Sequence, residues 1–266
     1  LATFNNGFSN YGTLVLDDLA ANNADIVVTG GDLENSGTIL LANTGGSPTG
    51  TRAIDAEVTN LGVIDVDEVG QILNTGRVFS TTDGTVDLRS GSTLTVQDGV
   101  TEFGSGTRLL GGSGVLSLAG TAELKLTTPY FHGGLADLSF GGAVLVTGDD
   151  FINEADFVGY DIDDVFAVRV VNEDRFLVEA RSALDATLIF EQGFENNDLL
   201  VLDDLAANNV VITVGGTGLQ NEGVLHSSNS GGNPSTGTRT INGDVFNVGK
   251  VDSDALLTLN ALFDTE

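Results

Sequence analysis

The chain contains no cysteine, no methionine and no tryptophan, and only 3 of its 266 residues are proline. The absence of cysteine excludes disulfide bonds and thiol catalysis, although it does not identify a compartment. Basic residues are also scarce, because 10 lysines and arginines face 38 aspartates and glutamates, which gives a formal net charge of −28. A surface of this sign repels nucleic acid and anionic membranes. Nucleic acid is therefore excluded as a partner.

The sequence also lacks a long hydrophobic run. No apolar stretch approaches the roughly 18 residues needed to cross a bilayer, and we find neither an initiator methionine nor a signal peptide. We expect no membrane insertion by this segment and expect any secretion or anchoring signal to lie outside it. Glycine is abundant, with 36 residues, beside a 41% apolar set rich in branched residues and 14 phenylalanines. This composition favours short strands joined by many turns over helices.

One stretch of the chain occurs twice. Residues 14–23 return letter for letter as residues 200–209, so that Asp17 recurs as Asp203 after 186 residues. A fixed period of this kind sets the architecture, and it indicates one long repeat followed by the start of the next, taken from a longer array. We accordingly expect three parts. They are β-helical coils of the first repeat at 1–128, an irregular aromatic and acidic β segment or insertion at 129–190, and a second repeat at 191–266 that copies residues 5–80.

A shorter motif recurs inside the first repeat. Asn-x-Gly followed by alternating apolar residues begins at Asn10, Asn35 and Asn60, which are 25 residues apart, and again at Asn74. Twenty-five residues are about what three short strands and three corners consume. The same asparagine at every corner would stack on its neighbour and bond the coil above. The sequence therefore predicts an all-β fold, a right-handed parallel β-helix (solenoid), with Asn35 and Asn60 on the same side of neighbouring coils.

Two segments depart from this pattern. Residues 42–52 are rich in Gly, Ser and Thr and are predicted to form a loop that protrudes from one coil, with its counterpart at 228–239. Residues 129–190 gather phenylalanines together with the carboxylates between Asp149 and Asp164. They form either irregular coils or a small β-rich insertion, and the sequence alone does not choose between the two.

The corner motif carries a resemblance to a known class of protein. With its Gly-Ser-rich short strands and very low lysine content, the chain resembles the repeat regions of filamentous haemagglutinin-like adhesins and other large bacterial surface proteins with β-helical stalks. The resemblance covers residues 4–80 and 190–255, and the secretion domain and cell-binding Arg-Gly-Asp motif of that family are not visible here. It implies a secreted structural or adhesive protein at the bacterial cell surface, and no catalytic residues carry over.

Two pairs of carboxylates are candidate metal ligands. Asp65 with Asp67, and Asp252 with Asp254, are two residues apart, so on a strand both members share one face, and such oxygen ligands suit Ca²⁺. Calcium requires six or more oxygens, and the competing interpretation is a solvated acidic face. Calcium is the single candidate cofactor, and none is certain.

Other ionisable residues carry weaker signals. The pairs Asp17-Asp18 and Asp203-Asp204 are expected at solvated surface, because neighbouring residues on a strand point to opposite faces. His132 and His226 are the two histidines, and they do not occupy the same position of the repeat. A shared metal-binding or catalytic role for them is therefore not expected.

Two classes of function remain open. The first is a structural or adhesive module of a large secreted repeat protein that forms an extracellular fibre, stalk or surface layer. Its partners would be copies of itself or adjacent repeats of the same chain, and surface glycans. The alternative is a polysaccharide-binding or polysaccharide-degrading β-helix, a lyase or hydrolase using carboxylates from 149–164. The duplicated scaffold favours the first class, and the shortage of cations disfavours a lyase acting on acidic glycans, so we expect no enzymatic activity.

Overall fold

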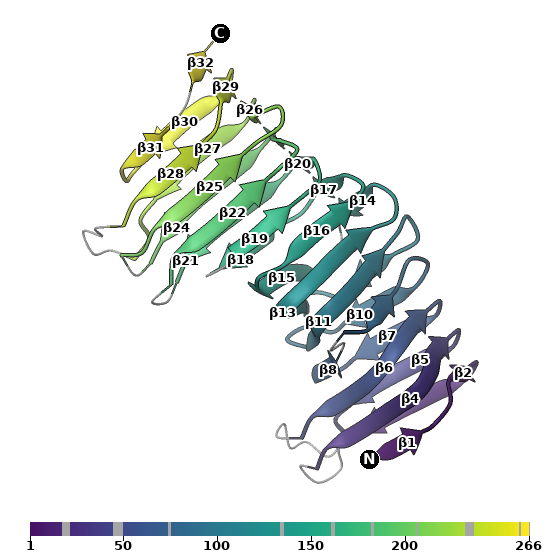
Figure 1. Ribbon diagram of the computed structural model, residues 1–266. Helices are drawn as coiled ribbons and strands as arrows, with labels where there is room; N and C mark the ends of the chain where they lie inside the picture. The colour runs from purple at the N-terminus through teal and green to yellow at the C-terminus, as the bar shows by residue number, and fades with distance from the viewer. Residues whose placement is uncertain are drawn as a thin grey trace. The chain divides into compact units, whose positions relative to one another are not determined.

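The computed structural model describes all residues except 18–21, 45–49, 74–75, 134–135, 161–162, 182–183, 206, 232–236, 261 and 266. The described residues form parallel β-strands joined by turns and bends (Figure 1). Within this described part of the chain no helix is long and apolar enough to cross a membrane. The chain divides into two compact units, Leu1–Thr128 with Gly134–Leu138 (unit 1), and Pro129–Gly133 with Ser139–Glu266 (unit 2).

Unit 1 is built from coils of one long and one short strand. The long strands form one parallel sheet and the short strands β3, β5, β7, β10 and β12 form a second. β1 and β2 pair with the first and second halves of β4, and β8 and β9 both pair with β6 and β11. The bounds are β1 (Ala2–Phe4), β2 (Phe8–Asn10), β3 (Thr13–Asp17), β4 (Ala24–Asn35), β5 (Thr38–Ala42), β6 (Arg52–Asn60), β7 (Val63–Val66), β8 (Val69–Leu73), β9 (Val78–Ser80), β10 (Thr85–Leu88), β11 (Thr93–Phe103), β12 (Arg108–Leu110) and β13 (Val115–Leu126).

Alternation along the strands places one set of side chains inside each coil. On β7, Ile64 and Val66 are fully buried, whereas Val63 and Asp65 are only partly covered. The long strands β4, β11 and β13 turn a corner without ending, through residues with positive φ. One is Gly120 on β13, with a φ of 78°. This left-handed backbone conformation favours glycine, because a side chain there would be strained.

Unit 2 is built from coils of three short strands. One column, β14-β17-β20-β23-β26-β29-β32, forms a seven-stranded parallel sheet, and the remaining strands pair in register from coil to coil. The bounds are β14 (Tyr130–His132), β15 (Asp137–Gly142), β16 (Leu145–Gly148), β17 (Phe151–Asn153), β18 (Phe157–Tyr160), β19 (Asp163–Phe166), β20 (Val170–Asn172), β21 (Arg175–Ala180), β22 (Ala186–Phe190), β23 (Phe194–Asn196), β24 (Leu199–Asp204), β25 (Val210–Val214), β26 (Leu219–Asn221), β27 (Val224–Ser228), β28 (Arg239–Asn242), β29 (Val245–Asn247), β30 (Lys250–Ser253), β31 (Leu257–Leu259) and β32 (Phe263–Thr265).

The aromatic segment supplies the core of unit 2. Its strands β17, β18 and β19 pair in register with β20, β21 and β22, and these in turn pair with β23, β24 and β25, the copies of strands of the first repeat. Seven phenylalanines stack along the interior with their rings in contact, and each is at most 1% exposed. They are Phe140, Phe151, Phe157, Phe166, Phe176, Phe190 and Phe194. These seven phenylalanines are thus inward-facing residues of stacked coils, whereas Phe131 on β14 is 56% exposed.

The asparagine corner behaves as the spacing predicted. Asn35 and Asn60 are register partners on β4 and β6, and Asn35 Nδ2 donates to Asn60 Oδ1 at 2.8 Å. The parallel β-helix, and the prediction that these two asparagines face the same side of neighbouring coils, are therefore confirmed. Asn60 in turn donates to Thr81 Oγ1 at 3.1 Å, so Thr81 continues the ladder. The fourth motif, at Asn74, lies outside the described residues.

Unit 2 contains a longer ladder of the same kind. Asn153, Asn172, Asn196, Asn221 and Asn247 end five successive strands of the seven-stranded sheet. The first four each donate through Nδ2 to Oδ1 of the next, at 2.5 to 2.8 Å. The ladder therefore has one direction, and the amides of Asn172, Asn196 and Asn221 each accept from one neighbour and donate to the other. Buried amides bonded in this way stabilise and specify the stacking register.

Candidate functional site

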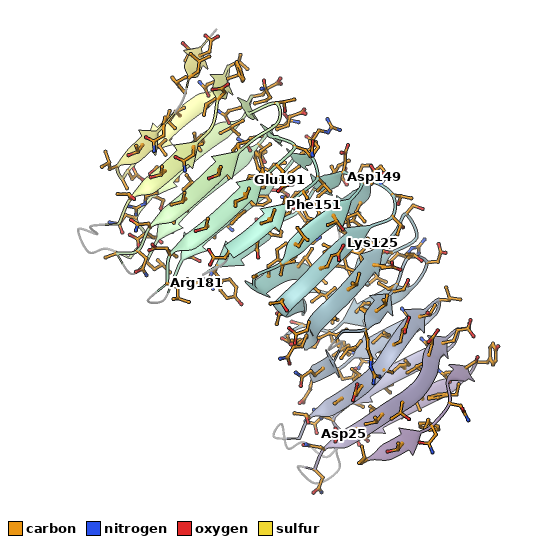
Figure 2. The ribbon with its side chains drawn as sticks, in the orientation of Figure 1. Asp25, Lys125, Asp149, Phe151, Arg181 and Glu191 are labelled. Atoms are coloured by element: carbon orange, nitrogen blue, oxygen red, sulfur yellow. The ribbon has the colours of Figure 1, made fainter. Side chains whose placement is uncertain are left out.

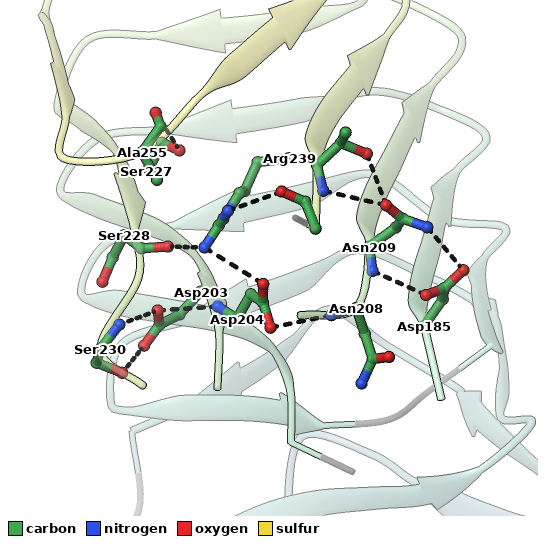
Figure 3. Close-up of polar contacts among 12 residues, drawn as sticks. Asp185, Asp203, Asp204, Asn208, Asn209, Ser227, Ser228, Ser230, Arg239 and Ala255 are labelled. Carbon is green, nitrogen blue, oxygen red and sulfur yellow. Dashed lines mark hydrogen bonds and ion pairs between the residues drawn. The ribbon is translucent and has the colours of Figure 1, made fainter. Parts of the chain in front are cut away.

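A buried polar cluster of unit 2 lies at the base of the connection between β27 and β28 (Figure 3). Arg239 opens β28 and is 1% exposed, and Asp204 ends β24 and is fully buried. Arg239 Nη2 lies 3.6 Å from Asp204 Oδ2. The guanidinium also donates to Ser228 O at 2.6 Å and to Gly237 O at 3.0 Å. A single side chain thus joins both ends of the connection, and we call this arrangement the loop clamp.

Asp203 secures the same connection from the neighbouring position. Its Oδ1 accepts the backbone N–H of Ser230 at 3.0 Å, and its Oδ2 accepts the Ser230 hydroxyl. Burial alone would raise the pKa of Asp203. Hydrogen bonds from Ser230, Ser228 and the Asp204 backbone to the charged form outweigh burial, so the pKa is lowered. Asp203 therefore stays ionised as a bonded anchor.

Unit 1 repeats this arrangement in its described residues. Arg52, also 1% exposed, donates through Nε to Ala42 O at 2.8 Å and through Nη1 to Gly50 O at 3.0 Å. Asp17 accepts the backbone N–H of Thr44 at 2.9 Å and the Thr44 hydroxyl. The counterpart of Asp204, Asp18, lies outside the described residues. The clamp is thus part of the repeat.

The expectation that the paired aspartates lie at solvated surface is wrong for Asp203 and Asp204, which are 7% and 0% exposed. Their burial is compensated because Arg239 and Ser230 supply donors beside the two carboxylates. Sequence reasoning also missed Arg52 and Arg239 as buried residues. The available signal was the Thr-Arg pair that ends both predicted loops, since an arginine kept at the base of a duplicated loop indicates a contact with the loop backbone.

The predicted metal ligands lie beside cationic side chains of the same chain. Asp65 on β7 and Asp67, which follows the end of that strand, both contact Arg89: Asp65 lies 3.1 Å from Nη2 and Asp67 lies 2.6 Å from Nε. Burial raises the pKa of Asp67; Arg89 acts in the opposite direction, and Asp65 adds to the increase. Among the described residues no group of three or more histidines and carboxylates has the geometry of a metal site. Calcium binding at Asp65 and Asp67 remains a prediction.

The second predicted pair lies in the last coils of unit 2. Asp252 Oδ2 accepts a hydrogen bond from Lys250 Nζ at 2.5 Å, and Asp254 Oδ2 lies 3.7 Å from His226 Nε2. The Lys250 hydrogen bond and its charge lower the pKa of Asp252. Here too each carboxylate has a potential cation within reach, and calcium binding stays a prediction.

Two buried titratable groups lie in the aromatic part of unit 2. His132 is the register partner of Asn153 and is fully buried, and burial lowers its pKa from 6.5 to about 4. Asp164 is 1% exposed, and its Oδ1 accepts the Val144 N–H at 2.7 Å. Burial raises the pKa of Asp164 from 3.8 to about 8, and the Val144 bond only partly opposes this change. At neutral pH both side chains are mainly uncharged.

Most of the scarce cations on the surface join neighbouring coils. Lys125 on β13, which Figure 2 labels, contacts Glu102 on β11 at 2.8 Å, and Arg169 contacts Asp150 at 2.7 Å and Glu195 at 3.5 Å. Arg77 lies 3.2 Å from Asp55. Exposed pairs of this kind contribute little each. They leave a large excess of carboxylates, which gives the surface its negative potential.

Comparison of the chain with protein-family models, with curated proteins and with solved structures finds no significant match. Function has to be inferred from the geometry. The described buried polar groups fall mostly into two sets, asparagine ladders and loop clamps, and both join backbone segments of adjacent coils. That is the chemistry of a scaffold that fixes the position of its loops.

Proposed function

We propose that the chain is a structural and adhesive module of a large secreted repeat protein that forms an extracellular fibre, stalk or surface layer. The observation that carries this proposal is the repetition of the loop clamp. Arg52 and Arg239 hold equivalent connections at equivalent positions of two repeats. A scaffold that bonds the base of the same connection in each repeat presents that connection at regular intervals.

The finer assignment follows the sequence resemblance. We place the chain with β-helical stalks of the filamentous haemagglutinin-like kind, at the bacterial cell surface, with surface glycans as the contacts of the clamped connections. Support comes from the parallel coils and from the net charge of −28, which keeps a long surface protein soluble. Copies of the chain or adjacent repeats are the second kind of partner.

The proposed adhesive role is tested by shortening the two clamped connections, β5 to β6 and β27 to β28. The chain is coated on beads, and binding to immobilised extracellular glycans is compared with variants in which residues 45–49, residues 232–236 or both are replaced by two glycines. We expect binding to fall with each deletion while the melting temperature stays within a few degrees. The control is Arg108→Gln, which alters an exposed side chain on β12. Full binding by the double deletion would contradict the role of the connections.

The alternative, a polysaccharide-degrading β-helix, draws on the raised pKa of Asp164, which is the property of a general acid. An acid must also reach its substrate, and Asp164 is 1% exposed inside the coil. The neighbouring Asp161 lies outside the described residues. We expect no reducing-end or unsaturated product from acidic or neutral polysaccharides. Turnover that disappears in Asp161→Asn or Asp163→Asn would establish the alternative.

A further inference from the structure

One outer face of unit 2 carries almost no charge. It is the outer surface of β19, β22, β25 and β28, four strands that pair in this order and appear as neighbouring arrows in Figure 1. Along each strand, outward side chains that are accessible to solvent alternate with buried ones. Asp163, Asp185 and Glu191 stand at the rim of this surface. We call it the neutral face, and its central residues are Val165, Thr187, Ile189, Val211, Thr213 and Asn242.

The neutral face differs from the other outer surfaces of unit 2. β23 in the seven-stranded sheet presents Glu195, and β30 presents Asp252, with side chains that are 39% and 46% exposed. On the neutral face the outward side chains bond each other instead. Asn242 Nδ2 donates to Thr213 Oγ1 at 3.4 Å, and Asn260 Nδ2 donates to Asn242 Oδ1 at 3.0 Å. In a chain with 38 acidic and 10 basic residues, a surface without a central carboxylate needs a physical reason.

The fold itself does not require this neutrality, as the first repeat shows. Val211 corresponds to Asp25 on β4, which lies 186 residues earlier. Asn242 corresponds to Asp55 on β6, because each follows the arginine of its loop clamp by three residues. Both aspartates point outward and are partly exposed, and Figure 2 labels Asp25. The coil therefore accepts carboxylates at these two positions, and their replacement by valine and asparagine in unit 2 points to a role beyond folding.

We infer that the neutral face binds the neutral face of a second copy, so that two copies lie side by side about a two-fold axis. This inference rests on the proposed function and names the surface through which copies associate. Because each copy carries a charge of −28, acidic surfaces of two copies repel each other, and the repulsion is weakest where neither has central carboxylates. Val165, Ile189 and Val211 supply apolar contacts, and facing sheets pack about 10 Å apart. One face serves both copies, which makes the contact isologous.

The neutral face lies along the side of the coils, so repeats stacked at either end would leave it open. Four strands about 4.8 Å apart and about 13 Å long span roughly 250 Å². Stable interfaces bury about 800 Å² per partner, so a single neutral face gives a weak contact. In an array the contact would recur with each repeat, and linked weak contacts reinforce each other. A covalent trap is therefore the suitable probe for this chain.

The absence of cysteine makes such a trap specific. Thr187→Cys and Thr213→Cys each place one thiol on the neutral face. Gln220→Cys places one on the outward side of β26 and is the matched control. A short bismaleimide then links thiols that meet. We expect both face variants to give several-fold more dimer than the control on a denaturing gel, and the excess to grow with added salt, which screens the remaining repulsion.

A second pair of substitutions changes the charge, and each is added to Thr213→Cys. Val211→Asp introduces the carboxylate that the first repeat has at Asp25, on the neutral face. Gln220→Glu introduces the one that the first repeat has at Glu34, away from the face. Val211→Asp should reduce the dimer to the level of the control thiol, whereas Gln220→Glu should leave it unchanged. Circular dichroism and melting show that the variants fold; should either fail, the comparison of the cysteine variants still decides.

Equal amounts of dimer from the face variants and from Gln220→Cys overturn the inference, because the cross-links then report random collisions. Dimer that survives Val211→Asp overturns it as well. The bead-binding assay, repeated with Val211→Asp, separates this inference from the proposed function, because the clamped connections are untouched. Unchanged glycan binding by a chain that gives no specific dimer refutes the pairing and leaves the proposed function standing. Glycan binding that is lost in Val211→Asp assigns the face to a glycan and also refutes the pairing.

Discussion

Asp164 couples the stability of unit 2 to pH. Its pKa is about 8 in the folded chain against 3.8 without burial, so between these values the folded state holds a proton that the unfolded state has released. Stability therefore falls as pH rises through this window, by on the order of 1.4 kcal/mol per pH unit. Asp164→Asn should remove this slope. Urea unfolding across the window checks it, and Asp163→Asn, an exposed neighbour, is the control that should keep most of the slope.

The buried His132 makes the stability of unit 2 depend on pH with the opposite sign over part of this range. Its pKa is about 4 when folded and 6.5 in the unfolded reference, so it adds stability that is present above 6.5 and is lost as pH falls towards 4. The contribution of Asp164 is consequently cleanest between pH 6.5 and about 8. A stability curve that is flat in that interval for both the parent and Asp164→Asn would contradict the burial argument.

The asparagine ladder gives a second prediction for a single residue. Asn196 accepts from Asn172 and donates to Asn221, so Asn196→Ala removes a partner from each. A buried polar group left unpaired costs about 1–3 kcal/mol, and we expect a loss of roughly 2–6 kcal/mol. Asn10→Ala is the matched control, because Asn10 is only partly buried and makes one ladder bond. Equal losses in the two variants, measured by chemical denaturation, would mean that the interior ladder bonds contribute nothing beyond packing.

Among the structural elements, the loop clamp predicts strong coupling between β24 and β28. Arg239→Met leaves Asp204 buried without its cation, and breaking a buried pair in this way costs about 3–5 kcal/mol. Asp204→Leu combined with Arg239→Met should lose clearly less than the two single variants summed, since no buried charge then remains. Arg108→Met changes an exposed arginine and should shift stability by less than about 0.5 kcal/mol. Additive losses across the double-mutant cycle would show that the two residues do not interact.

The strands and corners also show how much of the fold could be predicted from the sequence. The 25-residue spacing of Asn10, Asn35 and Asn60 predicted the coil, because an identical corner has to recur whenever strands stack in register. The burial of Asp204 was not predictable from alternation, since it depends on Arg239, which is distant in sequence and arrives there only through the intervening coil. The aromatic segment looked irregular for a related reason. Its corners lack the Asn-x-Gly motif of the first coils. Strands such as β18 and β22 still alternate between buried and partly covered residues, whereas β20 and β21 are buried almost throughout.

At the scale of the whole molecule, charge opposes the compact state. Two unit charges about 5 Å apart, the spacing of neighbouring strands, repel by roughly 3 kcal/mol at an effective dielectric of 20. Several such contacts rival the 5–15 kcal/mol or so that separates folded from unfolded protein.

Sequence position placed Asp65 and Asp67 together, but their contact with Arg89 depends on the next coil and was not foreseen. Arg89 offsets part of the repulsion, and a bound cation would offset more.

We therefore predict that millimolar Ca²⁺ raises the melting temperature at fixed ionic strength, because a site of paired carboxylates responds at concentrations too low to screen charge. Asp→Asn substitution at Asp65, Asp67, Asp252 and Asp254 together should abolish the shift. Arg89→Gln should enlarge it, since the variant removes the cation that contacts the first pair. Equal melting temperatures with and without Ca²⁺ would leave the acidic face with a role in solubility alone. A shift that survives the four substitutions would locate the binding among the carboxylates between Asp149 and Asp164.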